Sequence, residues 1–221
     1  MNILAIECTH AALSAAVKKD DNITELKSAD WRKAAEALVP LIEEVMAKSG
    51  LEKRDLDYIA ISSGPGSFTS LRIGMSVAKG IAYGLGIPLI AVPTMPAMAA
   101  SFQAGQGKVM AVIQARKGEY YFAVYSSEEL SSSVWHDEVL RGSASDVSAA
   151  AQGSAVVGRQ LDELRPSLAA CGSAYAEADF FSASSLFPAA ERHYGAADAV
   201  GLNHVVPDYR QMFIPKVVKE R

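Results

Sequence analysis

The order of strand-like and helix-like segments in the first hundred residues constrains the fold of this 221-residue chain more than any other feature. Three short β-type segments come first, and their connections are so short that the strands must be antiparallel neighbours. Helical and β-type segments then alternate, as in sheets whose parallel strands are joined by crossover helices. Strands are predicted at 2–7, 12–19, 23–28, 57–62 and 87–92, and helices at 30–48, 70–85 and 94–101. This is the order of a ribonuclease-H-like unit.

A second unit begins where the composition becomes polar and glycine-rich, in QAGQG (103–107). Two β-type runs flank Arg116-Lys117-Gly118, which is a hairpin signal, and a third run follows, so this half opens with the same meander as the first. Its strands are predicted at 108–115, 119–126, 132–140 and 154–158. We therefore predict an α/β protein with the two-half architecture of actin and the sugar kinases, in which the second half is reduced. The predicted domains are 1–103 and 104–221.

The stretch SGPGSFTSLRIG (63–74) joins a predicted strand to a predicted helix and contains three glycines. It is not a Walker-type loop, because the register that starts at Gly64 lacks the required lysine. Two interpretations stay open. The backbone N–H groups at the helix start could face an anion or nucleotide, or the glycines could only allow a tight turn that Ser67 or Thr69 caps. The residues of this candidate loop are Ser63, Gly64, Pro65, Gly66, Ser67 and Thr69.

Residues that nucleotide, metal or peptide chemistry requires do not form recognisable patterns. An actin-like ATPase needs an acidic, glycine-containing turn after the first strand, whereas this chain has IECTHAAL (6–13). The histidines lack the spacing of zinc enzymes, and there is no Gly-x-Ser-x-Gly. These histidines are His10, His136, His193 and His204. We predict no catalytic residue, no metal site and no cofactor of its own, and we expect Cys8 to be a small buried thiol.

Charge and hydropathy limit the partners and the location of the chain. A formal charge of −4 without a basic stripe predicts no strong direct binding of nucleic acid by this chain alone. No apolar run approaches the ~18 residues that cross a membrane. The first residues also lack the basic leader of a signal peptide. We therefore expect a cytoplasmic chain that does not enter a membrane.

The helix predicted at 70–85 is apolar on more sides than one sheet face requires, which predicts a second neighbour. Small residues on one line, among them Gly74 and Ala78, permit close approach of another helix, so we predict contact with another chain and a homodimer when the partner is missing. The predicted interface consists of Ala35, Leu38, Ile42, Leu71, Gly74, Met75, Ala78 and Ala82. If that line packs on the chain's own sheet instead, the exposed stripe is Ile73, Val77 and Ile81.

The first hundred residues resemble the TsaB family, formerly called YeaZ, in three segments: MNILAIECT, EALVPLIEEVM and SGLEKRDLDYIAISSGPGSFTSLRIGMSVAKGIAYGLGIPLIAVPTMPAMA. GPGSFTSLRIG is nearly the family signature, and ARKGEYYFAVY (115–125) is similar to the family's second-domain hairpin. Residues from about 130 onward match loosely. The chain departs from the family at Glu7-Cys8-Thr9, where Asp-Thr-Ser/Thr is usual, and at Ser70, which replaces the second signature glycine.

This resemblance implies an ASKHA fold and a non-catalytic subunit that works with TsaD, the catalytic relative, and with the ATPase TsaE. The complex transfers a threonylcarbamoyl group to the adenosine beside the anticodon of tRNAs that read codons starting with A. The resemblance also implies contact with TsaD through the helices at 31–48 and 70–85, with the partner interface as the place where ATP or ADP could bind. The alternative function is that of a self-sufficient enzyme, either an ASKHA ATPase or a glycoprotease-like peptidase.

Overall fold

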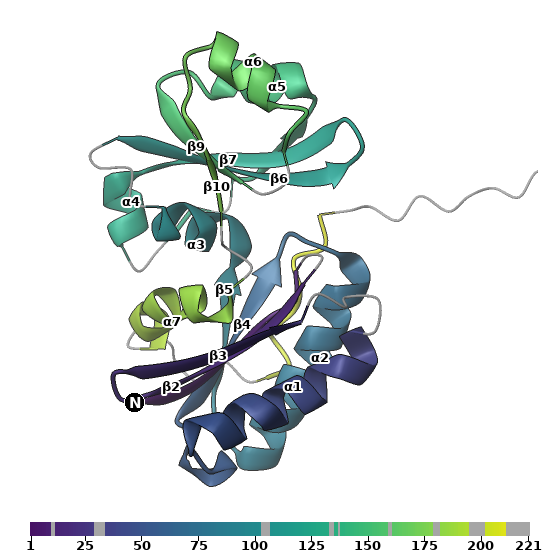
Figure 1. Ribbon diagram of the computed structural model, residues 1–221, viewed down its shortest axis with the longest axis vertical. Coiled ribbons are helices and arrows are strands. Elements are labelled where there is room, and N and C mark those ends of the chain that lie inside the picture. Colours follow the sequence, from purple (N-terminus) through teal and green to yellow (C-terminus); the bar gives the residue numbers. More distant parts are fainter. Residues whose placement is uncertain are drawn as a thin grey trace, which may run out of the picture.

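The computed structural model of the chain has five layers, stacked along the vertical axis of Figure 1. Two helices cover the outer face of a first five-stranded sheet, an inner layer of helices separates it from a second five-stranded sheet, and two short helices lie beyond that. The structure describes residues 1–9, 12–28, 34–102, 107–132, 135–136, 138–158, 161–178, 182–194 and 202–210.

The first sheet has the strand order β3-β2-β1-β4-β5. β1 pairs antiparallel with β2 and parallel with β4, so the predicted ribonuclease-H-like order is confirmed. Its strands are β1 (Asn2–Glu7), β2 (Leu13–Lys19), β3 (Asn22–Ser28), β4 (Tyr58–Gly64) and β5 (Leu89–Pro93). The helices that cover it are α1 (Ala34–Ser49) and α2 (Phe68–Leu85). Pro40 lies inside α1, and the predicted cap of this helix, Asp30, lies outside the described residues.

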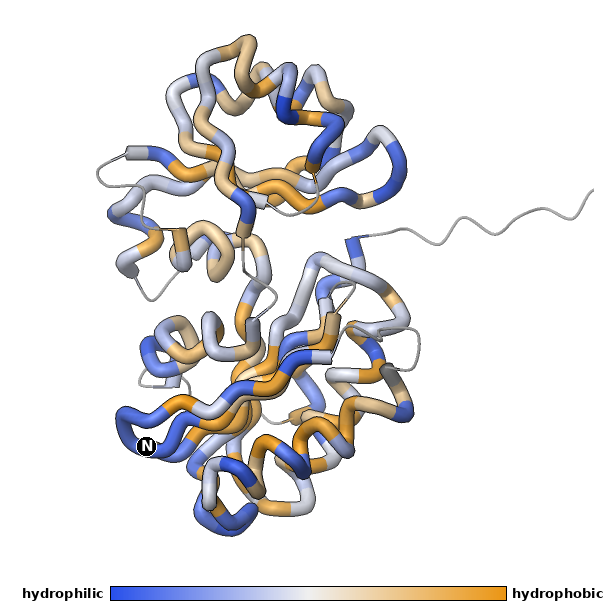
Figure 2. The backbone as a smooth tube through the Cα atoms, viewed as in Figure 1, coloured by the Kyte–Doolittle hydropathy of each residue, from blue (hydrophilic) through white to orange (hydrophobic). Residues whose placement is uncertain are grey.

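Both faces of the first sheet are buried, which explains the nearly continuous apolar run of β1. Leu4 and Ile6 face the core under α1 and α2, whereas Ile3 and Ala5 face the inner layer, because successive side chains of a strand point to opposite faces. Figure 2 shows the hydrophobic residues, in orange, along these strands and on the two helices. A one-residue change of register would exchange the two sets of side chains, so the pattern specifies the pairing of β1.

The second sheet repeats this topology with the order β10-β9-β6-β7-β8. β6 pairs antiparallel with β7 and parallel with β9, and the hairpin turn contains Gly118 at φ +76°. Its strands are β6 (Lys108–Arg116), β7 (Glu119–Ser126), β8 (Leu140–Gly142), β9 (Ser154–Gly158) and β10 (Tyr175–Glu177). Its helices are α4 (Ser127–Ser131), α5 (Ala144–Ala150) and α6 (Arg165–Ala170). The two-half ASKHA architecture is therefore confirmed, although the strand predicted at 132–140 is shorter and lies later.

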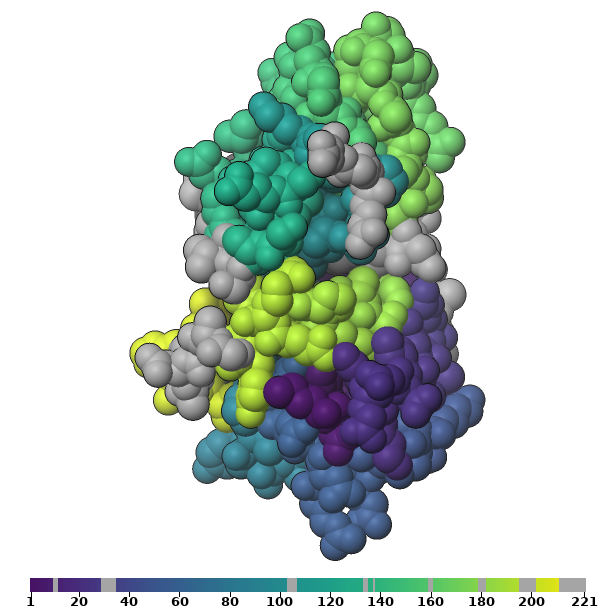
Figure 3. All heavy atoms as spheres, turned by 90° about the vertical axis from the view of Figure 1, so that its left-hand side faces the viewer, coloured from purple at the N-terminus to yellow at the C-terminus, as the bar shows by residue number. Residues whose placement is uncertain are grey.

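The inner layer connects the two halves through one shared core. It contains α3 (Thr94–Ser101), the 3₁₀ helix η3 (Ala183–Leu186) and α7 (Phe187–Tyr194). α3 packs mainly on β6, whereas α7 packs on β5 and η3 packs on β2, so the chain returns to the first sheet after completing the second. Figure 3 shows α7 as a yellow-green band across the waist of the molecule. The predicted division at residue 103 stays a prediction, but the segment 182–194 packs on the first sheet.

A polar cluster holds the returning segment on β2 and β3. The Glu25 carboxylate accepts hydrogen bonds from the hydroxyls of Ser14, Ser182 and Ser184 at 2.5 to 2.7 Å. Burial alone would raise the pKa of this carboxyl, but the three hydroxyls and the charge of Lys27 together lower it. Lowering the pKa favours the carboxylate, which is the form that accepts all three bonds. The cluster therefore fixes η3 against the first sheet at neutral pH.

Candidate functional site

The turn after β1 packs directly into the glycine-rich loop between β4 and α2. A Cβ added at Gly66 would lie 2.7 Å from Thr9 Cβ and 3.0 Å from Thr9 Cα. A Cβ added at Gly74 would overlap the Cys8 sulfur. Gly64 has φ +112°, a backbone conformation that favours glycine. The three glycines are therefore needed for close packing and for a sharp turn. Cys8 is fully buried there, as predicted, and burial raises the pKa of its thiol.

Hydrogen bonds complete this junction and start α2. The Ser67 N–H donates to the Thr9 carbonyl at 2.7 Å, and the Ser67 hydroxyl accepts from the Ser70 N–H as the helix N-cap. The Gly64 N–H donates to the Thr94 hydroxyl at 3.1 Å, which ties the loop to the start of α3. Thr69, the other candidate cap, is exposed. These contacts match the turn-and-cap interpretation of the stretch, with Ser67 as the cap.

A segment near the end of the chain lies beside the same loop. The Asp208 N–H donates to the Ser63 carbonyl at 2.7 Å, and the Asp208 carboxylate pairs with Arg210 at 2.7 Å. A hollow of about 210 Å³ next to the loop includes Ser63, Gly64, Pro65 and Asp208 in its wall. The charge of the Asp208 carboxylate in that wall is balanced by its ion pair with Arg210. Anion or nucleotide binding at this loop stays a prediction that no contact of the structure tests.

Glu7 is the buried acidic group of this region. It is fully enclosed, and its Oε1 accepts from the Thr9 N–H at 2.6 Å and also from the Thr9 hydroxyl. Burial is the largest influence and raises the pKa of this carboxyl, although the Thr9 groups and the nearby Ser62 hydroxyl partly offset it. The folded state therefore holds the Glu7 proton more tightly than the unfolded state does.

The raised pKa predicts a pH-dependent effect of Glu7→Gln. Protonated Glu7 favours folding below the ordinary carboxyl pKa of ~4.3, and this contribution is lost as the pH rises through the folded-state pKa. We expect Glu7→Gln to gain unfolding free energy relative to the parent protein on going from pH 4 to pH 7, measured by urea denaturation. The exposed Glu44→Gln serves as the control and should show a much smaller change. An identical effect of Glu7→Gln at both pH values would contradict the assignment.

The structure corrects the predicted partner interface. Most of its residues are buried within this single chain, where they lie between the helices and the first sheet: Leu38, Ile42, Leu71, Gly74, Met75, Ala78 and Ala82. Only Ala35 of the predicted set is exposed. The small residues do allow close approach, but the approaching group belongs to the chain itself, as Cys8 against Gly74 illustrates. These buried side chains are therefore not at the surface of the chain, where a partner could contact them.

One flank of α2 presents an aliphatic stripe next to open space. Ile73, Val77 and Ile81 follow one another at four-residue spacing and are half-buried at the edge of the core. Gly80 and Gly84 are exposed, and no atom lies within 4 Å of the position where either would carry a Cβ. This is the stripe that was predicted to be exposed if the small-residue line of this helix packs on the chain's own sheet. Two exposed glycines lie beside it.

The other flank of α2 carries aromatic and basic side chains that the sequence analysis did not select. The Arg72 guanidinium lies 4.2 Å from the ring centre of Phe68, and its Nε donates to the Tyr209 hydroxyl at 3.3 Å. Tyr83, further along this flank, is 82% exposed. The helical spacing of Phe68, Arg72 and Tyr83 was available as a signal, but the position of Tyr209 beside Phe68 and Arg72 was not.

The histidines lie at separate places in the described parts of the chain. His136 stacks on Tyr125 with ring centres 4.6 Å apart, His193 meets the edge of Trp135, and His204 is exposed. His10 lies outside the described residues. Within the ranges that the structure describes, no three His, Cys, Asp or Glu residues gather in a way that could hold a metal ion. None of the helices described is both long and apolar enough to pass through a bilayer.

Comparisons with known proteins give one consistent family. Residues 29–150 match the family model of TsaD, tRNA N6-adenosine threonylcarbamoyltransferase. The protein named tRNA threonylcarbamoyladenosine biosynthesis protein TsaB of Escherichia coli K12 is 36% identical over 140 residues, which are 62% of this chain and 60% of that protein. Its namesake from Haemophilus influenzae is 34% identical over 134 residues, which are 60% of this chain and 57% of that protein.

The fold has a solved counterpart over nearly its whole length. A crystal structure described as an uncharacterized protein with similarity to peptidase YEAZ from Pseudomonas aeruginosa superposes with a TM-score of 0.78, covering 95% of this chain and 99% of that one at 22% identity. At that identity the likeness shows the fold alone. In sequence, the chain spans only about 60% of the curated relatives it matches. The family model nevertheless covers more than half of this chain, and with these relatives it shows that the chain belongs to the TsaB (YeaZ) family.

Proposed function

We propose that this chain is a non-catalytic, activating subunit in the biosynthesis of threonylcarbamoyladenosine in tRNA. In this proposal it holds a TsaD-like catalytic subunit and works beside a TsaE-like ATPase. The names of the relatives support the pathway, because both are called tRNA threonylcarbamoyladenosine biosynthesis protein. Because the proposed role is in tRNA modification, the proposal includes a cytoplasmic location for the chain. With a formal charge of −4, the chain leaves the tRNA contacts to its partners.

The observation that carries the proposal is the exposed flank of α2. Ile73, Val77 and Ile81 leave a half-buried aliphatic stripe at the surface, beside Gly80 and Gly84 with open space above them. A helix of another chain can approach a glycine surface closely, because no side chain keeps the backbones apart. The same surface can meet a TsaD-like chain or, when that partner is missing, a second copy of this chain. ATP or ADP is then proposed only at the interface with the partners.

Gly80→Arg tests this surface without disturbing the interior. The new side chain extends into open space, and replacing glycine inside a helix favours folding by up to about 1 kcal/mol, so the variant should stay folded. At a dry contact its unpaired charge costs roughly 3–5 kcal/mol, which is more than about a hundredfold in affinity. We expect sedimentation to show a monomer and co-purification with the TsaD-like subunit to fail.

Gly107→Arg is the matched control, because Gly107 is also an open glycine but lies outside α2. It should associate like the parent protein. If Gly80→Arg associates normally with both a second copy and the TsaD-like subunit, the proposed surface is wrong. The non-catalytic role has its own test: ATP hydrolysis by the isolated chain, well above background and lost on changing Gly66 or Glu7, would favour the self-sufficient ATPase instead.

A further inference from the structure

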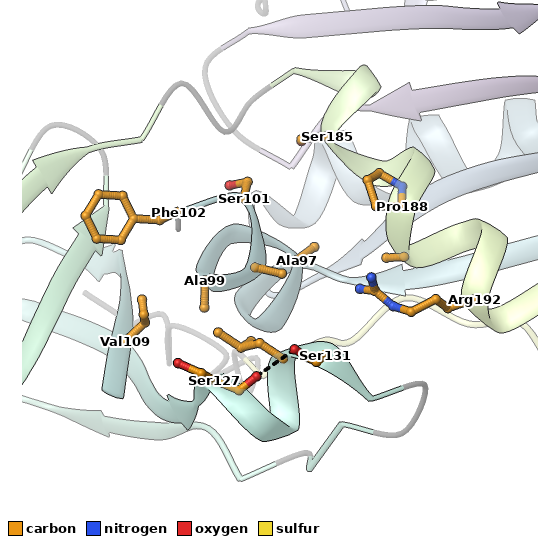
Figure 4. A pocket seen from close by; sticks show the side chains of 13 residues that line it. Ala97, Ala99, Ser101, Phe102, Val109, Ser127, Ser131, Ser185, Pro188 and Arg192 are labelled. Carbon is orange, nitrogen blue, oxygen red and sulfur yellow. Dashed lines mark hydrogen bonds between the residues drawn. The ribbon is translucent and has the colours of Figure 1, made fainter. Parts of the chain in front are cut away.

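A second hollow, unrelated to α2, lies between the two halves on the side of α3, α4 and α7. Its volume is about 770 Å³, within the range of sites that hold small organic molecules. Figure 4 shows side chains from all three helices around it, and Figure 3 shows the face where α4 lies above α7. Its apolar wall consists mainly of Phe102, Val109, Leu130, Pro188 and several alanines. The first sheet separates this hollow from α1 and α2.

Arg192 supplies the positive charge of this hollow. Of the described residues that line it, Arg192 is the one with a charged side chain. Figure 4 shows the guanidinium reaching from α7 toward Ala97 and Ser131. Arg192 Nε is buried and has no hydrogen-bond partner among the described residues. A buried donor without a partner costs free energy, and an acceptor supplied by a ligand would recover it.

The serine hydroxyls around the hollow cannot take the place of Arg192 as donors. Ser131 donates to the Ser127 carbonyl at 2.8 Å, and Ser101 donates to the Met98 carbonyl at 2.9 Å. Since each hydroxyl has a single hydrogen, these two are used within their own helices. The hydroxyls of Ser127 and Ser185 are also used, because they donate to the Gly107 and Ser182 carbonyls at 2.8 and 2.6 Å. The guanidinium is therefore the group that recognises charge here, and the apolar wall recognises a hydrophobic body.

We propose that this hollow binds a small organic anion that carries an apolar or aromatic body. Its acidic group pairs with the Arg192 guanidinium, and its body lies against Phe102, Leu130 and Pro188. This binding site is independent of the subunit contact proposed for α2, because it lies on the opposite side of the first sheet.

Calorimetric titration with two matched probes tests the site in the full chain. 1-Anilinonaphthalene-8-sulfonate carries an aromatic body and a sulfonate, and N-phenyl-1-naphthylamine carries the same rings without the charge. We expect one sulfonate molecule to bind per chain, with the neutral probe weaker by about ten- to hundredfold, the range of a hydrogen bond to a charged group. Arg192→Met should weaken only the sulfonate, by a similar factor. Arg165→Met, an exposed arginine on α6, should change neither.

A second variant keeps the test decisive if Arg192→Met fails to fold. Ala100 lines the hollow and is half-buried, so Ala100→Phe should fill the space and abolish binding of both probes while Arg192 stays in place. Circular dichroism confirms that each variant is folded. Equal binding of the two probes, or sulfonate binding unchanged in Ala100→Phe or in a folded Arg192→Met, would overturn the proposal.

Discussion

Gly66→Ala is expected to destabilise the protein by about 3 kcal/mol, the upper part of the range for overpacking a dense core. The new Cβ would lie 2.7 Å from Thr9 Cβ, which is closer than real Cβ atoms approach, and 3.0 Å from Thr9 Cα. The obstacle includes backbone, so a rotamer change cannot relieve it. The turn after β1 would have to move, which would also stretch the 2.7 Å bond from the Ser67 N–H to the Thr9 carbonyl.

Urea denaturation of Gly66→Ala and Gly107→Ala provides the measurement and its control. Gly107 also lacks a positive φ, but no atom lies within 4 Å of the position that a Cβ would take there, so alanine should be nearly neutral. A loss in Gly66→Ala comparable to that in Gly107→Ala would show that the β1 turn can yield. The close packing of Thr9 on the loop would then not be the reason for a glycine at this position.

Ala78→Glu is expected to cost at least about 3–5 kcal/mol, which is most of the stability of a protein at the lower end of the ordinary range of ~5–15 kcal/mol. Ala78 is fully buried on the side of α2 that faces the first sheet. The carboxylate would lose its hydration, and the core around it consists of apolar side chains such as Met75 and Ala82. Near-ultraviolet circular dichroism and urea denaturation should show a native state that is lost or that unfolds at a much lower urea concentration than in the parent protein.

Gly80→Glu gives the matched comparison two residues further along the same helix. Gly80 is exposed, and its side-chain position opens to empty space, so the same new charge should leave the fold intact. The pair separates the buried line of α2 from its free flank. If Ala78→Glu folded and merely became monomeric, Ala78 would belong to a contact between chains, and the packing of α2 described here would be wrong.

Much of the fold could be predicted because its signals are local. Alternating and continuous apolar runs marked β1, β6 and β7 within a few residues, and the short connections required antiparallel pairing. Ser67 and Thr69 could both be named as candidate helix caps, since capping depends on residue type at one position, and the structure has Ser67 as the cap. The repeated order of elements was then sufficient to predict two halves of the same topology.

By itself, the sequence determined that α2 has two apolar sides, but only the tertiary structure decided which of them faces the sheet. Ala78 and Val77 are both apolar, and their burial depends on what packs beside them. The return of η3 to β2 was also beyond sequence patterns, because Ser14 and Ser182 meet at Glu25 from opposite ends of the chain. Periodicity reports the neighbours of a residue along its own helix or strand. Contacts between distant segments leave no such period, and they alone place Arg192 at the hollow and Thr9 against Gly66.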